Sequence, residues 1–199
     1  LDVWVPSRNV AIEYHGLYWH SKSVLVDAVN YHERKMLACK EKGVALLQIF
    51  EDEWRDRRLI VEGMIRHRLG LQPHKFDARK LIVRRLELDE SRMFFDTNHL
   101  EGYVRSTASF GLCAPDSSIV AAISLRRPLF NRYPGWLELG RACCRIDANV
   151  RGWLGKLSTV ARNFAREQGS AGVMTYVDAR VGSGGAYASA GWVLVDADT

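Results

Sequence analysis

The sequence predicts a mixed α/β (α+β) protein built from two modules. Short apolar runs of strand length alternate with segments whose apolar residues recur every three or four positions, as they do on a helix face. The stretch Gly70–His74 combines glycine and proline and separates two such series. The 199 residues are 47% hydrophobic and 26% charged, which is typical of globular domains and excludes a disordered chain.

The first module is expected over residues 1–72. Leu1–Val5 and Val10–Tyr14 are β-prone runs, and Pro6–Asn9 between them predicts a four-residue hairpin loop. The elements expected next are a helix over Val24–Lys42 that stops at Gly43, a buried strand over Val44–Phe50, and a helix from the acidic run at Glu51 to about Arg68.

The second module is expected over residues 73–199. It begins with a strand and a short helix, continues with a β-rich stretch, and ends with a helix, a strand, a short helix and a strand. The expected ranges, in that order, are Lys80–Leu86, Glu90–Thr97, Tyr103–Cys113, Ile119–Leu125, Trp136–Cys144, Gly152–Arg166, Val173–Asp178, a turn of helix near Ala186, and Trp192–Val195.

Charge and cysteine usage narrow the functional classes. The 28 basic and 23 acidic side chains give a net charge of +5 and a pI near 9.1, which permits binding to polyanions without requiring it. Cysteines at 39, 113, 143 and 144 form no Cys-x-x-Cys pair, so neither a disulfide framework nor a zinc site is expected. Reduced thiols, with no signal segment and no membrane-length apolar run, predict a cytoplasmic protein.

Two carboxylates in the first module are expected to face each other. If Pro6–Asn9 is the hairpin loop, paired residue numbers sum to fifteen and Asp2 lies opposite Glu13. Facing side chains have Cβ atoms about 5 Å apart, where like charges are destabilising. A divalent cation between them removes that cost, and Mg²⁺ favours one or two carboxylates with water and a phosphate oxygen. The hairpin therefore predicts a site for Mg²⁺ (or Mn²⁺).

Histidines and aromatic residues follow this pair closely. His15, His20 and His32 are candidates to move a proton to or from a reacting oxygen. Tyr18 and Trp19 are candidates to stack on or wedge between bases. A metal, a base and an aromatic wedge together favour phosphodiester hydrolysis. The alternatives remain open: solvated surface acids, packed aromatics and a hydrogen-bonded core histidine.

The same residues carry a resemblance to a known family. The strings that carry it are Leu1-Asp-Val-Trp-Val-Pro6, Ala11-Ile-Glu-Tyr-His-Gly-Leu-Tyr-Trp-His20, Tyr31-His-x-x-Lys35 and Gln48-Ile-Phe-Glu-Asp-Glu-Trp54. Over residues 1–70 the chain resembles phage homing endonucleases of the EDxHD type, which are related to very-short-patch repair endonucleases within the PD-(D/E)xK fold. The resemblance implies Asp2 as a metal ligand, His20 as general base or acid, and Glu13 and His32 in support.

The sequence departs from that family in three ways. The family's nuclease domain starts with a helix that carries a further acidic residue and would precede Leu1, so a truncated nuclease core is expected. His15 stands where the homing enzymes often have Asn, although the repair enzymes have His. His32 stands where the repair enzymes carry an acidic residue.

The second module resembles a phage-encoded domain with the GNAT acyltransferase fold, over about residues 76–196. The strings that carry this resemblance are Asn98-His-Leu-Glu-Gly102, Trp136-x-Glu-Leu-x-Arg141, Val150-x-Gly-x-x-x-Lys-Leu157 and Tyr176-x-Asp-Ala-Arg180 with Tyr187 and Gly191-Trp192. In such acyltransferases a Gln/Arg-x-x-Gly-x-Gly/Ala loop at a helix N-terminus holds the pyrophosphate of acetyl-CoA. Here Asn149 and Leu154 replace the first and last residues of that pattern, and Leu154 is expected to crowd the backbone, so acetyl-CoA is not the favoured cofactor. Tyr187 matches a frequent general acid, but a packed aromatic is the favoured reading.

The predicted function is a Mg²⁺-dependent DNA endonuclease of the homing or short-patch-repair type, with the GNAT-like module assisting contact with double-stranded DNA. Besides Tyr18 and Trp19, the residues expected to contact DNA are Lys22, Lys35, Arg105, Arg126 and Arg127. Two alternatives stay open: a GNAT-type acyltransferase or DNA-base-modifying enzyme, and an inactive DNA-binding module. The oligomeric state does not follow from the sequence.

Overall fold

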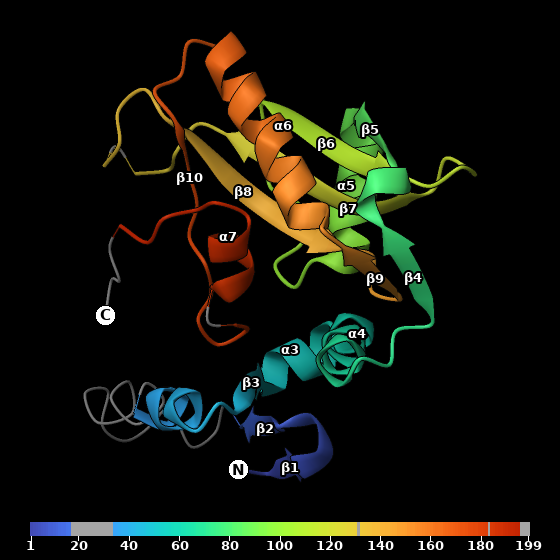
Figure 1. Cartoon of the computed structure of the whole chain (residues 1–199), viewed down its shortest axis with the longest axis vertical. Coiled ribbons are helices and arrows are strands. Elements are labelled where there is room, and N and C mark those ends of the chain that lie inside the picture. The colour runs from blue at the N-terminus through green and yellow to red at the C-terminus, as the bar shows by residue number, and fades with distance from the viewer. Residues whose placement is uncertain (17–33, 131, 183, 196–199) are drawn as a thin grey trace. The chain divides into compact units, whose positions relative to one another are not determined.

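The computed structural model describes residues 1–16, 34–130, 132–182 and 184–195 (Figure 1). The chain forms two compact units. Unit 1 consists of Leu1–Leu71 together with the later segment Val177–Gly184, and unit 2 of Gln72–Tyr176 and Gly185–Thr199. The mixed α/β class is confirmed, because both units combine sheets with helices.

Unit 1 contains a three-stranded sheet in the order β1-β2-β3. The strands are β1 (Val3–Val5), β2 (Val10–His15) and β3 (Ala45–Phe50). A 3-10 turn over Pro6–Arg8 joins β1 to β2, and the observed pairs, such as Val5 with Val10 and Val3 with Ile12, all sum to fifteen. β3 lies parallel to β2 on its other side. The expected hairpin and its register are therefore confirmed.

Helices flank this sheet in the sequence. Residues 34–41 are helical, and Cys39 from that segment packs with Ala11 and Leu46 in a small core. After β3 the chain forms α3 (Glu51–Asp56) and α4 (Arg58–Leu69). A single helix was expected here, but Arg57 has φ −130°, outside the helical range, and divides it in two.

Unit 2 is built on a five-stranded sheet in the order β10-β8-β7-β6-β5 and a two-stranded sheet of β4 and β9. β7 is antiparallel to both of its neighbours, β6 and β8, whereas β10 is parallel to β8. The bounds are β4 His74–Asp77, β5 Ile82–Arg85, β6 Ala108–Cys113, β7 Ile119–Arg126, β8 Leu137–Cys144, β9 Ala148–Arg151 and β10 Val173–Met174.

Helices cover both faces of the five-stranded sheet. α6 (Trp153–Glu167) lies across one face, as Figure 1 shows, and buries Leu154, Leu157 and Ala161 at helical spacing. α5 (Leu88–Asn98) packs on the other face, where Phe95 is fully buried near Ala122. The short α7 (Gly185–Ser189) lies beside α6. Among the described residues, no helix is both long and apolar enough to cross a membrane.

Two expectations for unit 2 differ from the structure. β4 and β9 were not expected, and they pair with each other in parallel across 74 residues of chain. The strand expected over Val173–Asp178 covers only two residues, and Trp192–Val195 forms no strand. β8 also carries a bulge: Leu125 faces Leu139 and Ser124 faces Arg141, so Gly140 has no partner on β7.

Candidate functional site

The two carboxylates of the predicted metal site both have protein partners. The backbone N–H of Tyr14 donates to Asp2 Oδ2 at 2.7 Å. Glu13, 8% exposed, forms an ion pair through Oε1 with Lys35 Nζ, whereas its buried Oε2 has no hydrogen-bond partner among the described residues. A lysine beside Glu13 removes the repulsion for which a cation was invoked.

The buried histidine of unit 1 also has a partner. His15 is 5% exposed, and its Nε2 lies 3.1 Å from Oε1 of the buried Gln48. His15 also contacts the ring of Phe50, with ring centroids 5.0 Å apart. The other predicted residues of this module, Tyr18, Trp19, His20, Lys22 and His32, lie outside the described residues.

A segment from the second half of the chain completes unit 1. The backbone N–H of Gln48 donates to the carbonyl of Arg180 at 3.3 Å. The Arg180 guanidinium lies 4.9 Å from the centre of the Phe50 ring and 3.2 Å from Glu53 Oε1. No pattern in the sequence indicates this contact, because the partners are more than 120 residues apart.

In unit 2, the second half of β8 has a strand partner on one side only. β10 pairs with Leu137 and Glu138 alone, and the hydroxyl of Thr175 then donates to the carbonyl of Leu139 at 3.0 Å. The first three residues of β8 are buried, whereas the five from Gly140 onward are only partly buried. Within the described residues, the edge of β8 therefore has no neighbouring strand from the bulge at Gly140 to its end, and the Gly140 carbonyl accepts from Arg141 Nη1 at 2.8 Å.

The N-terminus of α6 is free of the side chains that usually fill such a position. Gly152 precedes the helix with φ +76° and offers no capping side chain, and the first turn holds no acidic residue. Leu154 was expected to crowd this end, but its side chain is 6% exposed and packs into the core. At Gly155, a Cβ atom would meet no heavy atom within 4 Å. The backbone N–H groups of this turn can thus be approached by an anion.

Titratable side chains gather along the same half of β8. The pKa of Tyr187 is raised, first by burial and then by the nearby Cys143 thiol. The pKa of His99 is lowered to about 4 by burial and by Arg141. Arg141 donates from Nε to the Gly102 carbonyl at 2.9 Å and pairs with Glu101. The glycine inside β8 is the one signal in the sequence of the bulge beside Arg141.

The arginines predicted to contact DNA have different environments. Arg126 pairs with the buried Glu138, whose carboxylate also accepts the N–H of Leu129 at 3.2 Å. Arg105 and Arg127 are exposed. Of these three arginines, Arg126 is therefore already paired with a carboxylate inside unit 2.

No protein-family model matches this chain, and no curated protein matches it. Among solved structures, it is similar to an aminoglycoside acetyltransferase from an uncultured soil metagenomic sample, in complex with sisomicin. The sequence identity is 15%, the match covers 50% of this chain and 79% of the other, and the TM-score is 0.37. It is also similar to a GNAT-family acetyltransferase from Streptococcus pneumoniae TIGR4. There the identity is 13%, the coverage is 58% and 89%, and the TM-score is 0.41. Both are consistent with the predicted GNAT-like domain.

These findings correct the main functional prediction. The prediction of a DNA endonuclease, a hydrolase with Mg²⁺ or Mn²⁺ as cofactor, is wrong, and the structures to which the chain is similar are acetyltransferases. No comparison supports a homing-endonuclease or PD-(D/E)xK core. Within the described ranges, no group of three or more His, Cys, Asp or Glu side chains is placed to hold a metal ion. The physical reason is that Asp2 already accepts from Tyr14 and that Lys35 neutralises the charge of Glu13.

Proposed function

We propose that unit 2 is an acyltransferase that takes its acyl group from an acyl-coenzyme A thioester. The observation that carries this proposal is the early separation of β10 from β8. The separation leaves β8 without a neighbouring strand next to a bulge, which is what an extended, amide-containing chain needs in order to bind as an added strand.

The α6 N-terminus supports the proposal from a second direction. It follows β8 by way of β9, so the anion-accepting turn belongs to the same part of the chain. Leu154 is buried in the core, and the space beside Gly155 is empty. The departures from the usual pyrophosphate pattern, Asn149 and Leu154, therefore do not block access of a phosphate to this turn. The N–H groups of the first turn would hold phosphate oxygens, and the positive end of the helix dipole favours their charge.

Tyr187 would supply the proton. A thioester brings an acyl group activated for transfer to an amine or hydroxyl. The raised pKa of Tyr187 keeps its phenol protonated at neutral pH, and Tyr187 packs against the core of unit 2 to which Leu139 of β8 belongs. Tyr187 can therefore give its proton to the sulfur that leaves when the carbon–sulfur bond breaks. Its ring is held by Trp192, with centroids 5.8 Å apart.

The test is calorimetric titration of the whole chain with acetyl-coenzyme A. We expect binding, and we expect Gly155→Glu to raise the Kd at least about tenfold, because it adds a negative charge where the phosphates would lie. The same substitution favours the helix itself, since glutamate in a first turn is stabilising and glycine is not. Asn163→Glu, which makes the same charge change in the middle of α6, is the matched control and should leave the Kd nearly unchanged.

Two results would reject the proposal: no binding at millimolar acetyl-coenzyme A, or equal Kd values for Gly155→Glu and the parent chain. The Tyr187→Phe variant separates chemistry from binding. It keeps the contact with Trp192, so the Kd should be unchanged. In the presence of an amine acceptor, thiol release from acetyl-coenzyme A should fall about 100- to 10,000-fold, the size of effect expected for a lost proton donor.

A further inference from the structure

One end of the five-stranded sheet of unit 2 gathers exposed arginines. β5 ends at Arg85 and β7 ends at Arg126, while β6 begins at Ala108; the antiparallel pairing brings these points to the same end. The N–H of Thr107 still donates to the carbonyl of Leu125 at 2.7 Å. Arg105 and Arg127 therefore lie just beyond two neighbouring strands, whose usual separation is about 5 Å. We call Arg85, Arg105 and Arg127 the basic end.

Two arginines beside the basic end are neutralised, whereas these three are not. Arg84 donates twice to Glu90 at 2.7 Å, and Arg126 pairs with the buried Glu138. Within the described part of the chain, the members of the basic end form no ion pair with a carboxylate, and all three are exposed. Three positive charges on neighbouring strands repel one another, so an anionic partner would be stabilised there.

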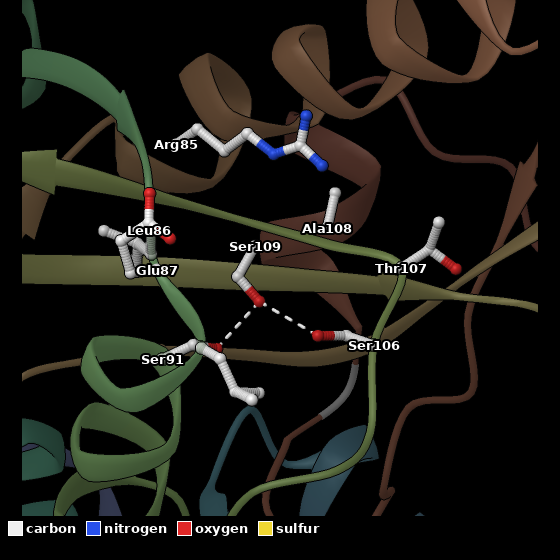
Figure 2. A pocket seen from close by; sticks show the side chains of 9 residues that line it. Arg85, Leu86, Glu87, Ser91, Ser106, Thr107, Ala108 and Ser109 are labelled. Atoms are coloured by element: carbon white, nitrogen blue, oxygen red, sulfur yellow. Dashed lines mark hydrogen bonds between the residues drawn. The ribbon is translucent and has the colours of Figure 1, made fainter.

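A polar pocket of about 210 Å³ opens at the same place (Figure 2). Its floor is a set of three hydroxyls: Ser91 donates to Ser109 Oγ at 2.8 Å, and Ser106 Oγ lies 3.1 Å from the same atom. Figure 2 shows the Arg85 guanidinium on the side of the pocket where Ala108 and Thr107 lie, away from the bonded serines. One water occupies about 30 Å³ of liquid, so the pocket admits several waters or one phosphate group.

Apolar side chains stand next to these charges. Leu129 and Phe130 follow Arg127 and Pro128 in the β7–β8 connection, and each is 69% exposed. A large exposed aromatic beside arginines is typical of surfaces that bind single-stranded nucleic acid. On such surfaces, arginines contact phosphates and aromatic rings stack on unpaired bases.

We infer that the basic end of unit 2 binds single-stranded nucleic acid. Arg105 and Arg127 contact successive phosphates, Arg85 contacts one further phosphate, and Phe130 stacks on a base. Single strands are preferred to duplexes because the bases of a duplex are already stacked on one another. This inference concerns a surface apart from the proposed acyl-transfer site and holds or fails independently of it.

The test is fluorescence anisotropy of the whole chain with a labelled single-stranded oligodeoxynucleotide, repeated with its duplex. We expect the single strand to bind more tightly and its affinity to fall steeply between about 50 and 200 mM salt. Arg105→Glu with Arg127→Glu should weaken binding at least about tenfold and reduce the slope of log K against log salt by about 1.4, because each single-strand phosphate contact contributes about 0.7.

The matched control makes the same charge change on α6, with Arg162→Glu and Arg166→Glu, both at exposed positions. Equal weakening by the control pair would overturn the inference, since net charge alone would then explain binding. Competition by polyglutamate as effective as by the oligonucleotide would overturn it too.

The Phe130→Ala variant tests stacking, because it leaves the net charge unchanged. It should weaken single-strand binding about tenfold with the salt slope unchanged, and an equal effect on the duplex would reject stacking. If the glutamate pair lowers the midpoint of thermal unfolding, Arg105→Gln with Arg127→Gln replaces it.

Discussion

Unit 1 and unit 2 treat their polar side chains in opposite ways. In unit 1, the residues that suggested chemistry are bonded to one another: Glu13 to Lys35, and His15 to Gln48. In unit 2, the groups proposed to bind ligands lack a partner of the usual kind among the described residues. The edge of β8 beyond Leu139 has no neighbouring strand, the first turn of α6 has no capping side chain, and the basic end has no ion-pairing carboxylate.

The difference shows what a cluster of reactive residue types means. Carboxylates, histidines and aromatics within the first 32 residues suggested a metal centre, because each residue type has that use elsewhere. A side chain already satisfied inside the fold has little left to offer a ligand, and breaking its bond costs stability. An unpaired donor has no such cost. Open hydrogen-bonding capacity, which needs coordinates, therefore indicates a site better than proximity in sequence.

The largest effect expected from this comparison is at Arg126. Arg126→Ala leaves the Glu138 carboxylate, 5% exposed, without its cation, so we expect a loss of about 3–5 kcal/mol in the free energy of unfolding of unit 2. Urea unfolding followed by hydrogen exchange of the β7 and β8 amides measures it. Its exposed neighbour provides the control, and Arg127→Ala should cost less than about 0.5 kcal/mol. The double variant Arg126→Met with Glu138→Leu should recover most of the loss, and a double variant as unstable as Arg126→Ala would contradict the account.

A pH titration should show the next largest effect, at His99. Burial and Arg141 lower its pKa to about 4 in the folded protein, below the ordinary value of 6.5. The unfolded chain therefore takes up the proton first, and stability is lost as the pH falls from 6.5 to 4. A shift of this size corresponds to about 3 kcal/mol.

Unfolding measured at several pH values between 8 and 4 checks this prediction. His99→Gln should flatten the curve over that window. A curve for His99→Gln as steep as that of the parent chain would show that another group carries the dependence.

How far the sequence predicts this fold depends on the range of the interactions involved. The hairpin register follows from Pro6–Asn9 alone, because a short loop fixes which residues face each other. The pairing of β4 with β9 joins residues 74 positions apart, and four-residue strands show no usable alternation. The break between α3 and α4 at Arg57 could not be predicted, because no glycine or proline lies there.

The candidate site was less predictable for a related reason. The pattern at Asn149–Leu154 was read as a poor phosphate loop, because a leucine replaces a small residue there. Only the structure shows that Leu154 turns into the core, so that the helix end stays open. Likewise, the length of β10 is set by where the chain leaves β8, at the bond between Thr175 and Leu139, and β-propensity carries no information on this.

The smallest expected effect lies in unit 1, at Glu13. Glu13→Gln removes the charge beside Lys35 but keeps an oxygen that can accept from its Nζ. The side chains of the pair are 11% and 21% exposed, so we expect a loss of about 1–2 kcal/mol in the local stability of β2, read from hydrogen exchange of its amides. Lys35→Met added to Glu13→Gln should cost less than the sum of the two single changes, because the pair acts as a unit.

The same variant distinguishes a structural carboxylate from a metal ligand. If Glu13 serves the fold through Lys35, Mg²⁺ leaves the unfolding midpoints of the parent chain and of Glu13→Gln unchanged, since a ligand stabilises only a state that it binds. A midpoint that rises with Mg²⁺ in the parent chain alone would mean that the Glu13–Lys35 pair opens to admit a cation. The carboxylates of unit 1 would then be available to a ligand, as the edge of β8 in unit 2 is, and the two units would not differ in this respect.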